Sequence, residues 1–192
     1  MTPRSVSRSR ITGILVALAC LAFSAIGLEV NDPPAFTYVD GVRDHVVEIE
    51  GAELVVGEVQ VGTRIVRRGE VRAETTGMFV TVQTTLAVPG PRRVTLNQSQ
   101  LITQDRTYDN VTSSSMAADT GFQQSQDLVF EVDPTQIDDL TLEIWYGGIV
   151  QGFYQRARIH LGITDENAEQ WRQAAKGRDL EPDPYGTVEA LS

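Results

Sequence analysis

The chain has 192 residues, a net charge of −10 and one cysteine, Cys20. Residues 1–28 hold three arginines and no acidic residue, so residues 29–192 carry a net charge of −13. A surface of that charge repels nucleic acid, so we expect no DNA or RNA partner. Residues 29–192 lack cysteine and therefore form no intrachain disulfide.

The first element in chain order is an uncharged run of 18 residues, Ile11–Leu28, which follows the three arginines. As a helix it spans about 27 Å, slightly less than a hydrocarbon core of about 30 Å. This length favours a retained anchor in the cytoplasmic membrane over a cleaved signal segment. Cleavage after Gly27 is the alternative, because small residues precede that position. In both cases residues 1–10 stay cytoplasmic and the following domain is extracytoplasmic, tethered or secreted.

Residues 29–43 are typical of a linker between the membrane segment and a folded domain. Pro33-Pro34 and Asp40-Gly41 interrupt regular structure, and the apolar residues show no period. We therefore expect the folded domain to begin at residue 44.

Residues 44–163 show the period of two that is typical of strands with one buried face. Eight or nine short strands with turn signals between them, and no long helix, predict two packed sheets. The expected fold is an all-β, immunoglobulin-like antiparallel β-sandwich. In the clearest strand, 78–88, the residues on one face are Met78, Val80, Val82, Leu86 and Val88.

Residues 112–125 are polar and predict a long loop within the sandwich. Loops at one end of a sandwich commonly form binding surfaces. The candidate interaction residues in this loop are Ser113, Ser114, Ser115, Met116, Phe122, Gln123 and Gln124.

One helix is predicted after the sandwich, over residues 164–177. Thr164 or Asp165 can cap its start, and Gly177 can end it. We expect Trp171 to dock this helix on the sandwich, with contact to a partner as the alternative role. Residues 178–192 hold four acidic residues and two prolines and predict an acidic, flexible tail.

No motif predicts catalysis, a metal or a cofactor. The chain has no Gly-x-Ser-x-Gly sequence, and residues 29–192 have no thiol. Its two histidines, His45 and His160, are too few for a zinc site. The aspartates within 105–109 and 133–139 lack the spacing of a calcium loop. We therefore expect a protein that is not an enzyme, although a converging pair of carboxylates stays open as an alternative.

Three segments together resemble the telokin-like, or Mpr-like, immunoglobulin-fold family of bacterial cell-envelope proteins. They are Gly77–Val82, Leu101–Tyr108 and Asp127–Pro134, within residues 50–146. Pro89-Gly90-Pro91 stands where that family usually has asparagine. The resemblance implies an immunoglobulin-like fold and a place in the cell envelope, and it implies no catalytic residue.

Together these features predict a membrane-tethered, non-enzymatic domain that binds another protein of the cell envelope. The alternative is a secreted ligand-binding accessory domain of a transporter or secretion system.

Overall fold

The computed structural model describes residues 36–112, 115–148 and 155–191. The predicted membrane segment Ile11–Leu28 lies outside these residues. Within the described ranges, none of the helices has the length and apolar character needed to cross a membrane.

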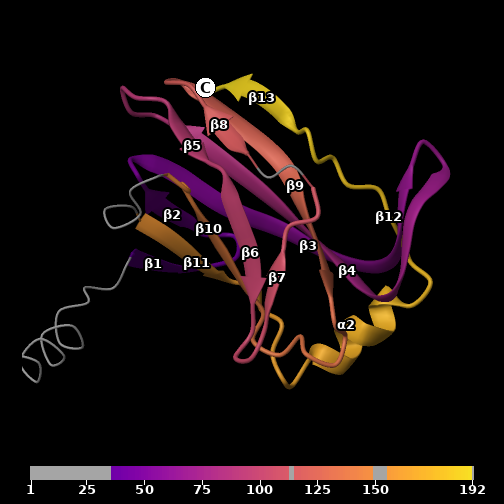
Figure 1. Cartoon of the computed structure of the whole chain (residues 1–192). Coiled ribbons are helices and arrows are strands. Elements are labelled where there is room, and N and C mark those ends of the chain that lie inside the picture. The colour runs from indigo at the N-terminus through magenta and orange to yellow at the C-terminus, as the bar shows by residue number, and fades with distance from the viewer. Residues whose placement is uncertain (1–35, 113–114, 149–154, 192) are drawn as a thin grey trace, which may run out of the picture. The chain divides into compact units, whose positions relative to one another are not determined.

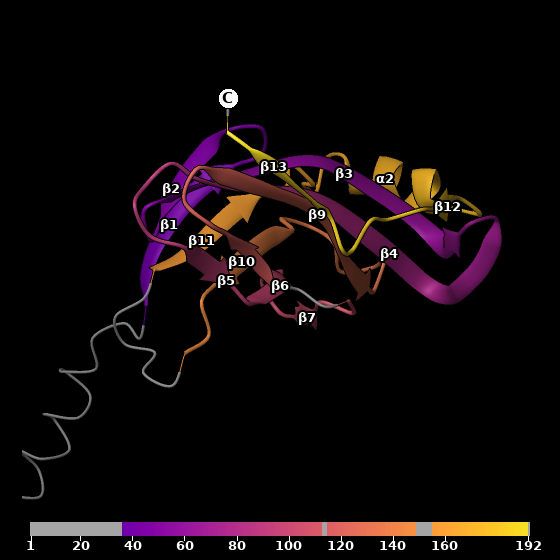
Figure 2. The ribbon, with the colours of Figure 1, turned by 90° about the horizontal axis from the view of Figure 1, so that it is seen from above.

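The described residues form a sandwich of a five-stranded and a six-stranded sheet, with a small two-stranded sheet beside them (Figures 1 and 2). The five-stranded sheet has the order β1 (Thr37–Val42), β11 (Gln155–His160), β10 (Thr141–Trp145), β6 (Gln98–Ile102), β7 (Thr107–Asp109). The six-stranded sheet has the order β12 (Asp179–Leu180), β3 (Ala52–Arg67), β4 (Glu70–Val88), β9 (Phe122–Val132), β13 (Thr187–Ala190), and β2 (Val46–Ile49) also pairs with β3. The two-stranded sheet joins β5 (Val94–Leu96) and β8 (Met116–Ala118).

The core lies between the two larger sheets and follows the predicted alternation. All five residues on the predicted inward face of β4 are at most 1% exposed. Val80 of β4 lies opposite Phe130 of β9, which is fully buried. The five-stranded sheet contributes buried residues such as Leu142 and Ile159 to the same core. The prediction of an all-β sandwich is confirmed. The antiparallel prediction is wrong at two pairs, β1 with β11 and β12 with β3, which are parallel.

The second half of the predicted linker belongs to the sandwich, because Thr37–Val42 forms the edge strand β1. It pairs with β11 from Thr37 opposite Gln155 to Val42 opposite His160. Gly41 is required here, since a Cβ atom at that position would lie 2.3 Å from Val47 Cγ2. The glycine that indicates a break in the sequence therefore allows close packing in the structure, and the sandwich includes Thr37–Val42.

The C-terminal helix is shorter than predicted. Helix α2 spans Ala168–Ala175, and its N-cap is Asn167. The Asn167 side chain accepts a hydrogen bond from the Thr164 N–H and donates one to the Gly162 carbonyl, both at 2.9 Å. These bonds form a turn before the helix, so neither Thr164 nor Asp165 is the cap. Trp171 is partly buried and packs against the core, the docking contact expected for it.

The predicted flexible tail is also part of the fold. We call residues 178–191 the C-terminal strap. It crosses the six-stranded sheet from β12 (Asp179–Leu180) at one edge to β13 (Thr187–Ala190) at the other (Figure 1). β12 pairs with β3, and β13 pairs with β9. Leu180 is only 1% exposed and packs with Phe79 and Val129 in a second apolar cluster. Acidic residues and prolines hide this role in the sequence, because most of the contacts are made by the main chain.

We expect Leu180→Ala to lower the free energy of unfolding by about 2 kcal/mol, since it removes a buried leucine side chain. The matched control is Val188→Ala in the same strap, where the side chain is 61% exposed. Its effect should stay within about 0.5 kcal/mol. Urea denaturation of both variants checks this expectation, and equal effects would show that the strap is not anchored at Leu180.

Candidate functional site

The segment predicted as an interaction loop is mostly strand. Met116 lies in β8 and is fully buried, so its side chain is not available to a partner. Phe122, Gln123 and Gln124 begin β9 and pair with β13. Gln124 Oε1 accepts a hydrogen bond from the Ala117 N–H at 2.7 Å, which ties β9 to β8. Ser115 is exposed, and Ser113 and Ser114 lie outside the described residues.

A different surface gathers the side chains that usually bind proteins: the outer face of the five-stranded sheet, defined as the side turned away from the six-stranded sheet. The strand register sets two adjacent rows of side chains across it. The first row is Tyr38, Arg156, Trp145 and Gln98, and the second is Asp40, Arg158, Glu143 and Gln100.

Arg156 is the centre of this face. Its guanidinium lies 3.7 Å from the centroid of the Trp145 ring and 3.9 Å from that of Phe36. The two rings meet edge to face, with centroids 6.4 Å apart. Arg156 Nη1 also donates to Glu143 Oε2 at 2.8 Å, and Gln100 Nε2 donates to the same oxygen at 2.7 Å. The Glu143 side chain is 6% exposed, so this carboxylate is buried but compensated.

A second arginine and a second aromatic ring extend the face toward the sheet edge. Arg158 binds Asp40 through two hydrogen bonds, of 2.8 and 3.2 Å, and its guanidinium lies 4.2 Å from the centroid of the Tyr38 ring. The hydrogen bonds to Asp40 raise the pKa of the Arg158 guanidinium. Tyr38 is 41% exposed. The face therefore offers the Tyr38 ring and the partly exposed Arg158, while the Arg156 side chain, 13% exposed, contacts the Trp145 and Phe36 rings; its charges are already paired.

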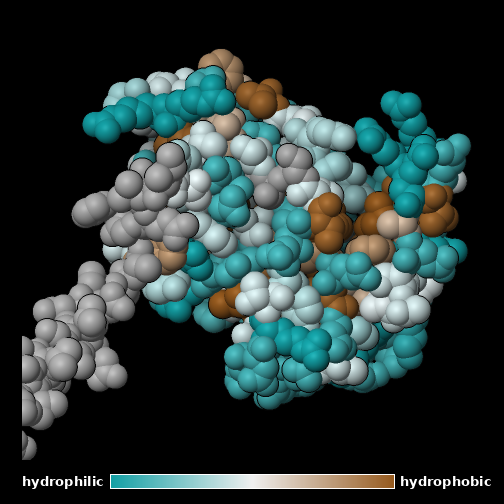
Figure 3. Space-filling model, viewed as in Figure 1, coloured by the Kyte–Doolittle hydropathy of each residue, from teal (hydrophilic) through white to brown (hydrophobic). Residues whose placement is uncertain are grey.

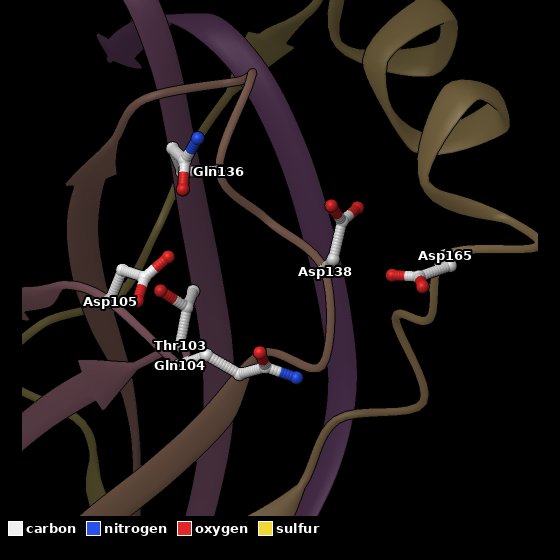
Figure 4. Close-up of a pocket in the computed structure, with 6 residues that line it drawn as sticks. All are labelled: Thr103, Gln104, Asp105, Gln136, Asp138 and Asp165. Carbon is white, nitrogen blue, oxygen red and sulfur yellow. The ribbon is translucent and has the colours of Figure 1, made fainter.

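The structure also contains a polar hollow of about 210 Å³ between the β6–β7 turn, the loop after β9 and the approach to α2 (Figure 4). Asp165 points toward Asp138, while Asp105 lies beside Thr103. Asp138 lies 3.5 Å from Arg172 Nη2. The lining of the hollow is polar and includes the three aspartates Asp105, Asp138 and Asp165. Across the described ranges, no three His, Cys, Asp or Glu side chains group closely enough to hold a metal ion.

The side of the molecule that Figure 3 shows carries polar and apolar side chains mixed together, with no large apolar groove. In Figure 3 the apolar patches on the side in view are small and are separated by polar side chains. Such a surface resembles the rest of a protein's exterior in bulk hydrophobicity, which is normal for interfaces between separately folded proteins.

The sequence contains part of the signal for this face. The alternation in 154–161 places Arg156, Arg158 and His160 on one side, which the structure confirms, but it favours a solvated face. A hairpin turn at Gly147-Gly148 would place Trp145 opposite Val150, whereas the structure places it opposite Arg156, so the turn signal does not predict this contact. Phe36 could not be found in this way, because it precedes a strand that the sequence pattern did not indicate.

No family model and no curated protein matches the chain. The solved structures similar to it include the yjhA protein from Bacillus subtilis, at 10% identity and a TM-score of 0.45, covering 79% of this chain and 99% of that one. Another is an uncharacterized β-sandwich protein from Clostridium difficile 630, at 5% identity and a TM-score of 0.40, covering 65% of this chain and 95% of that one. These likenesses concern the fold alone.

Proposed function

We propose that this protein is a non-enzymatic, extracytoplasmic domain that binds another protein through the outer face of the five-stranded sheet. The observation that carries the proposal is a pair of neighbouring contacts between arginine and aromatic rings. Arg156 contacts the Trp145 and Phe36 rings, and Arg158 contacts the Tyr38 ring. Aromatic residues and arginine dominate the binding energy of protein interfaces. Within the described residues, helix α2 and the C-terminal strap contact strands of the six-stranded sheet rather than this face.

The arrangement suits binding because its side chains are held in place before a partner arrives. Arg156 is fixed between two rings and a carboxylate, so contact with a partner orders little that is still free. A preorganised surface loses less conformational entropy on association than a set of mobile side chains does.

The proposed location is the outer side of the cytoplasmic membrane, with Ile11–Leu28 as the tether. The support is the uncharged length of this segment and the arginines before it. We also infer a relation to the telokin-like envelope proteins. Its support is that two of the three resembling segments lie in β4 and β9, which pair directly, and the third spans β6 and β7.

A ligand-binding accessory role is the second candidate, and one hollow favours it. This hollow, of about 340 Å³, lies between α2 and the β3–β4 pair. Apolar side chains such as Met78 and Ala175 line it beside Arg172, Lys176 and Glu169, a mixed lining that suits a small polar ligand with an apolar body.

Site-specific photo-crosslinking in intact cells tests the proposed face. We expect a photoreactive residue at Tyr38 to capture one defined partner, while the same residue at the exposed Val188 of the six-stranded sheet does not capture that partner. Arg158→Glu should abolish the Tyr38 crosslink and leave the melting temperature within a few degrees of the wild type. Identical crosslinks from Tyr38 and Val188, or a Tyr38 crosslink that survives Arg158→Glu, would refute this face.

A further inference from the structure

We propose that the end of the C-terminal strap is exchangeable: residues 183–191 of one chain pair with β9 of a second copy, and the reverse, to give a strand-swapped dimer. This exchange lies on the six-stranded sheet and is independent of the proposed partner-binding face.

The first observation is how β13 is held. All four of its residues, Thr187–Ala190, are exposed, so no side chain anchors the strand in the core. Its attachment is the main-chain ladder from Thr187 opposite Ser125 to Ala190 opposite Phe122, extended by the Leu191 N–H to the Gly121 carbonyl at 2.8 Å. Main-chain ladders of this kind are the basis of strand addition between chains.

The second observation identifies the strand that fits. Gly186 has a φ of 66°, and a Cβ atom there would lie 2.1 Å from the Ser125 carbonyl oxygen. The Asp127 N–H donates to the Asp183 carbonyl at 2.9 Å, and the Asp183 N–H donates to Asp127 Oδ2 at 2.8 Å. Asp183 Oδ1 accepts hydrogen bonds from the N–H groups of Tyr185 and Gly186. These features demand an Asp and a Gly at fixed spacing. A second copy of the chain carries the same Asp183 and Gly186, so its strap is the occupant from another molecule that matches β9.

The third observation is a point at which the strap can separate. Leu180 anchors its first part in an apolar cluster, whereas residues 181–186 form no helix or strand and contain Pro182 and Pro184. Residues 183–191 can thus leave β9 while Leu180 stays in place.

Exchange is possible because the strap makes the same contacts with β9 in the monomer and in the swapped dimer. A swapped dimer regains every hydrogen bond that each monomer loses, so the balance depends on the segment between Leu180 and Asp183 and on concentration. An unpaired β9 is also an exposed edge, which favours its pairing with another chain.

Disulfide trapping in the full-length chain tests the exchange. Gln123 and Glu189 lie opposite each other across β9 and β13. In a Cys20→Ser background, one tagged chain carries Gln123→Cys and a second, differently tagged chain carries Glu189→Cys. We expect mild oxidation of the mixed proteins to give a disulfide-linked heterodimer, seen on non-reducing gels.

Two matched variants make the result specific. Val188→Cys in place of Glu189→Cys puts the thiol on the opposite side of β13, and Gly186→Ala blocks docking of the strap. Each should lower the heterodimer yield at least tenfold. The proposal is overturned if the heterodimer fails to form while a single chain carrying both cysteines forms its internal disulfide. It is equally overturned if the yield is unchanged by either variant.

Discussion

We expect Arg156→Met to lower the free energy of unfolding by about 3–4 kcal/mol, because it leaves the buried Glu143 carboxylate without its cation. Gln100 still donates one hydrogen bond to that carboxylate but brings no charge. The variant also loses the guanidinium contacts with the Trp145 and Phe36 rings. Chemical denaturation of the variant and the wild type measures the difference.

Two further variants separate the charge from the packing. Arg158→Met breaks an exposed pair, in which the Asp40 side chain is 60% exposed, and should cost less than about 1 kcal/mol. Adding Glu143→Gln to Arg156→Met removes the stranded charge and should restore most of the lost stability. If Arg156→Met were no more harmful than Arg158→Met, the pair would not be the buried centre that its geometry indicates.

The parts of the fold that sequence reasoning found are those whose side chains record burial. In β4, apolar residues recur at every second position from Met78 to Val82, and these side chains fill the core. The missed parts are held mainly by their main chain. β1 shows exposed or half-exposed side chains throughout, and β13 shows only exposed ones, so neither has a hydrophobic period.

The same reason explains why the outer face was only partly anticipated. Arg156 and Glu143 are typical surface residues, and the Arg156 guanidinium is covered by Phe36, which lies 120 positions before it in the chain. Local patterns report which side of a strand a residue occupies, but not what covers that side. Placing Trp145 and Phe36 on either side of Arg156 requires knowing that β11 lies between β10 and β1.

The second large effect concerns the start of the folded domain, which the sequence pattern places at residue 44 although Thr37–Val42 forms strand β1 in the structure. We expect a chain beginning at Phe36 to fold, and a chain beginning at Asp44 to be less stable than it by at least about 3 kcal/mol. The shorter chain lacks β1, and with it the ladder on β11, the Asp40 partner of Arg158 and the Phe36 ring over Arg156.

Loss of β1 also leaves β11 as an unprotected edge, so the shorter chain should form larger assemblies than the longer chain does at the same concentration. Thermal unfolding and light scattering of the two chains provide the measurement. Gly41→Ala in the longer chain is an independent check, because its Cβ atom would collide with Val47 and should cost about 1–3 kcal/mol through overpacking. A linker would tolerate both changes, so equal melting temperatures for all three proteins would mean that residues 36–43 contribute nothing to the sandwich.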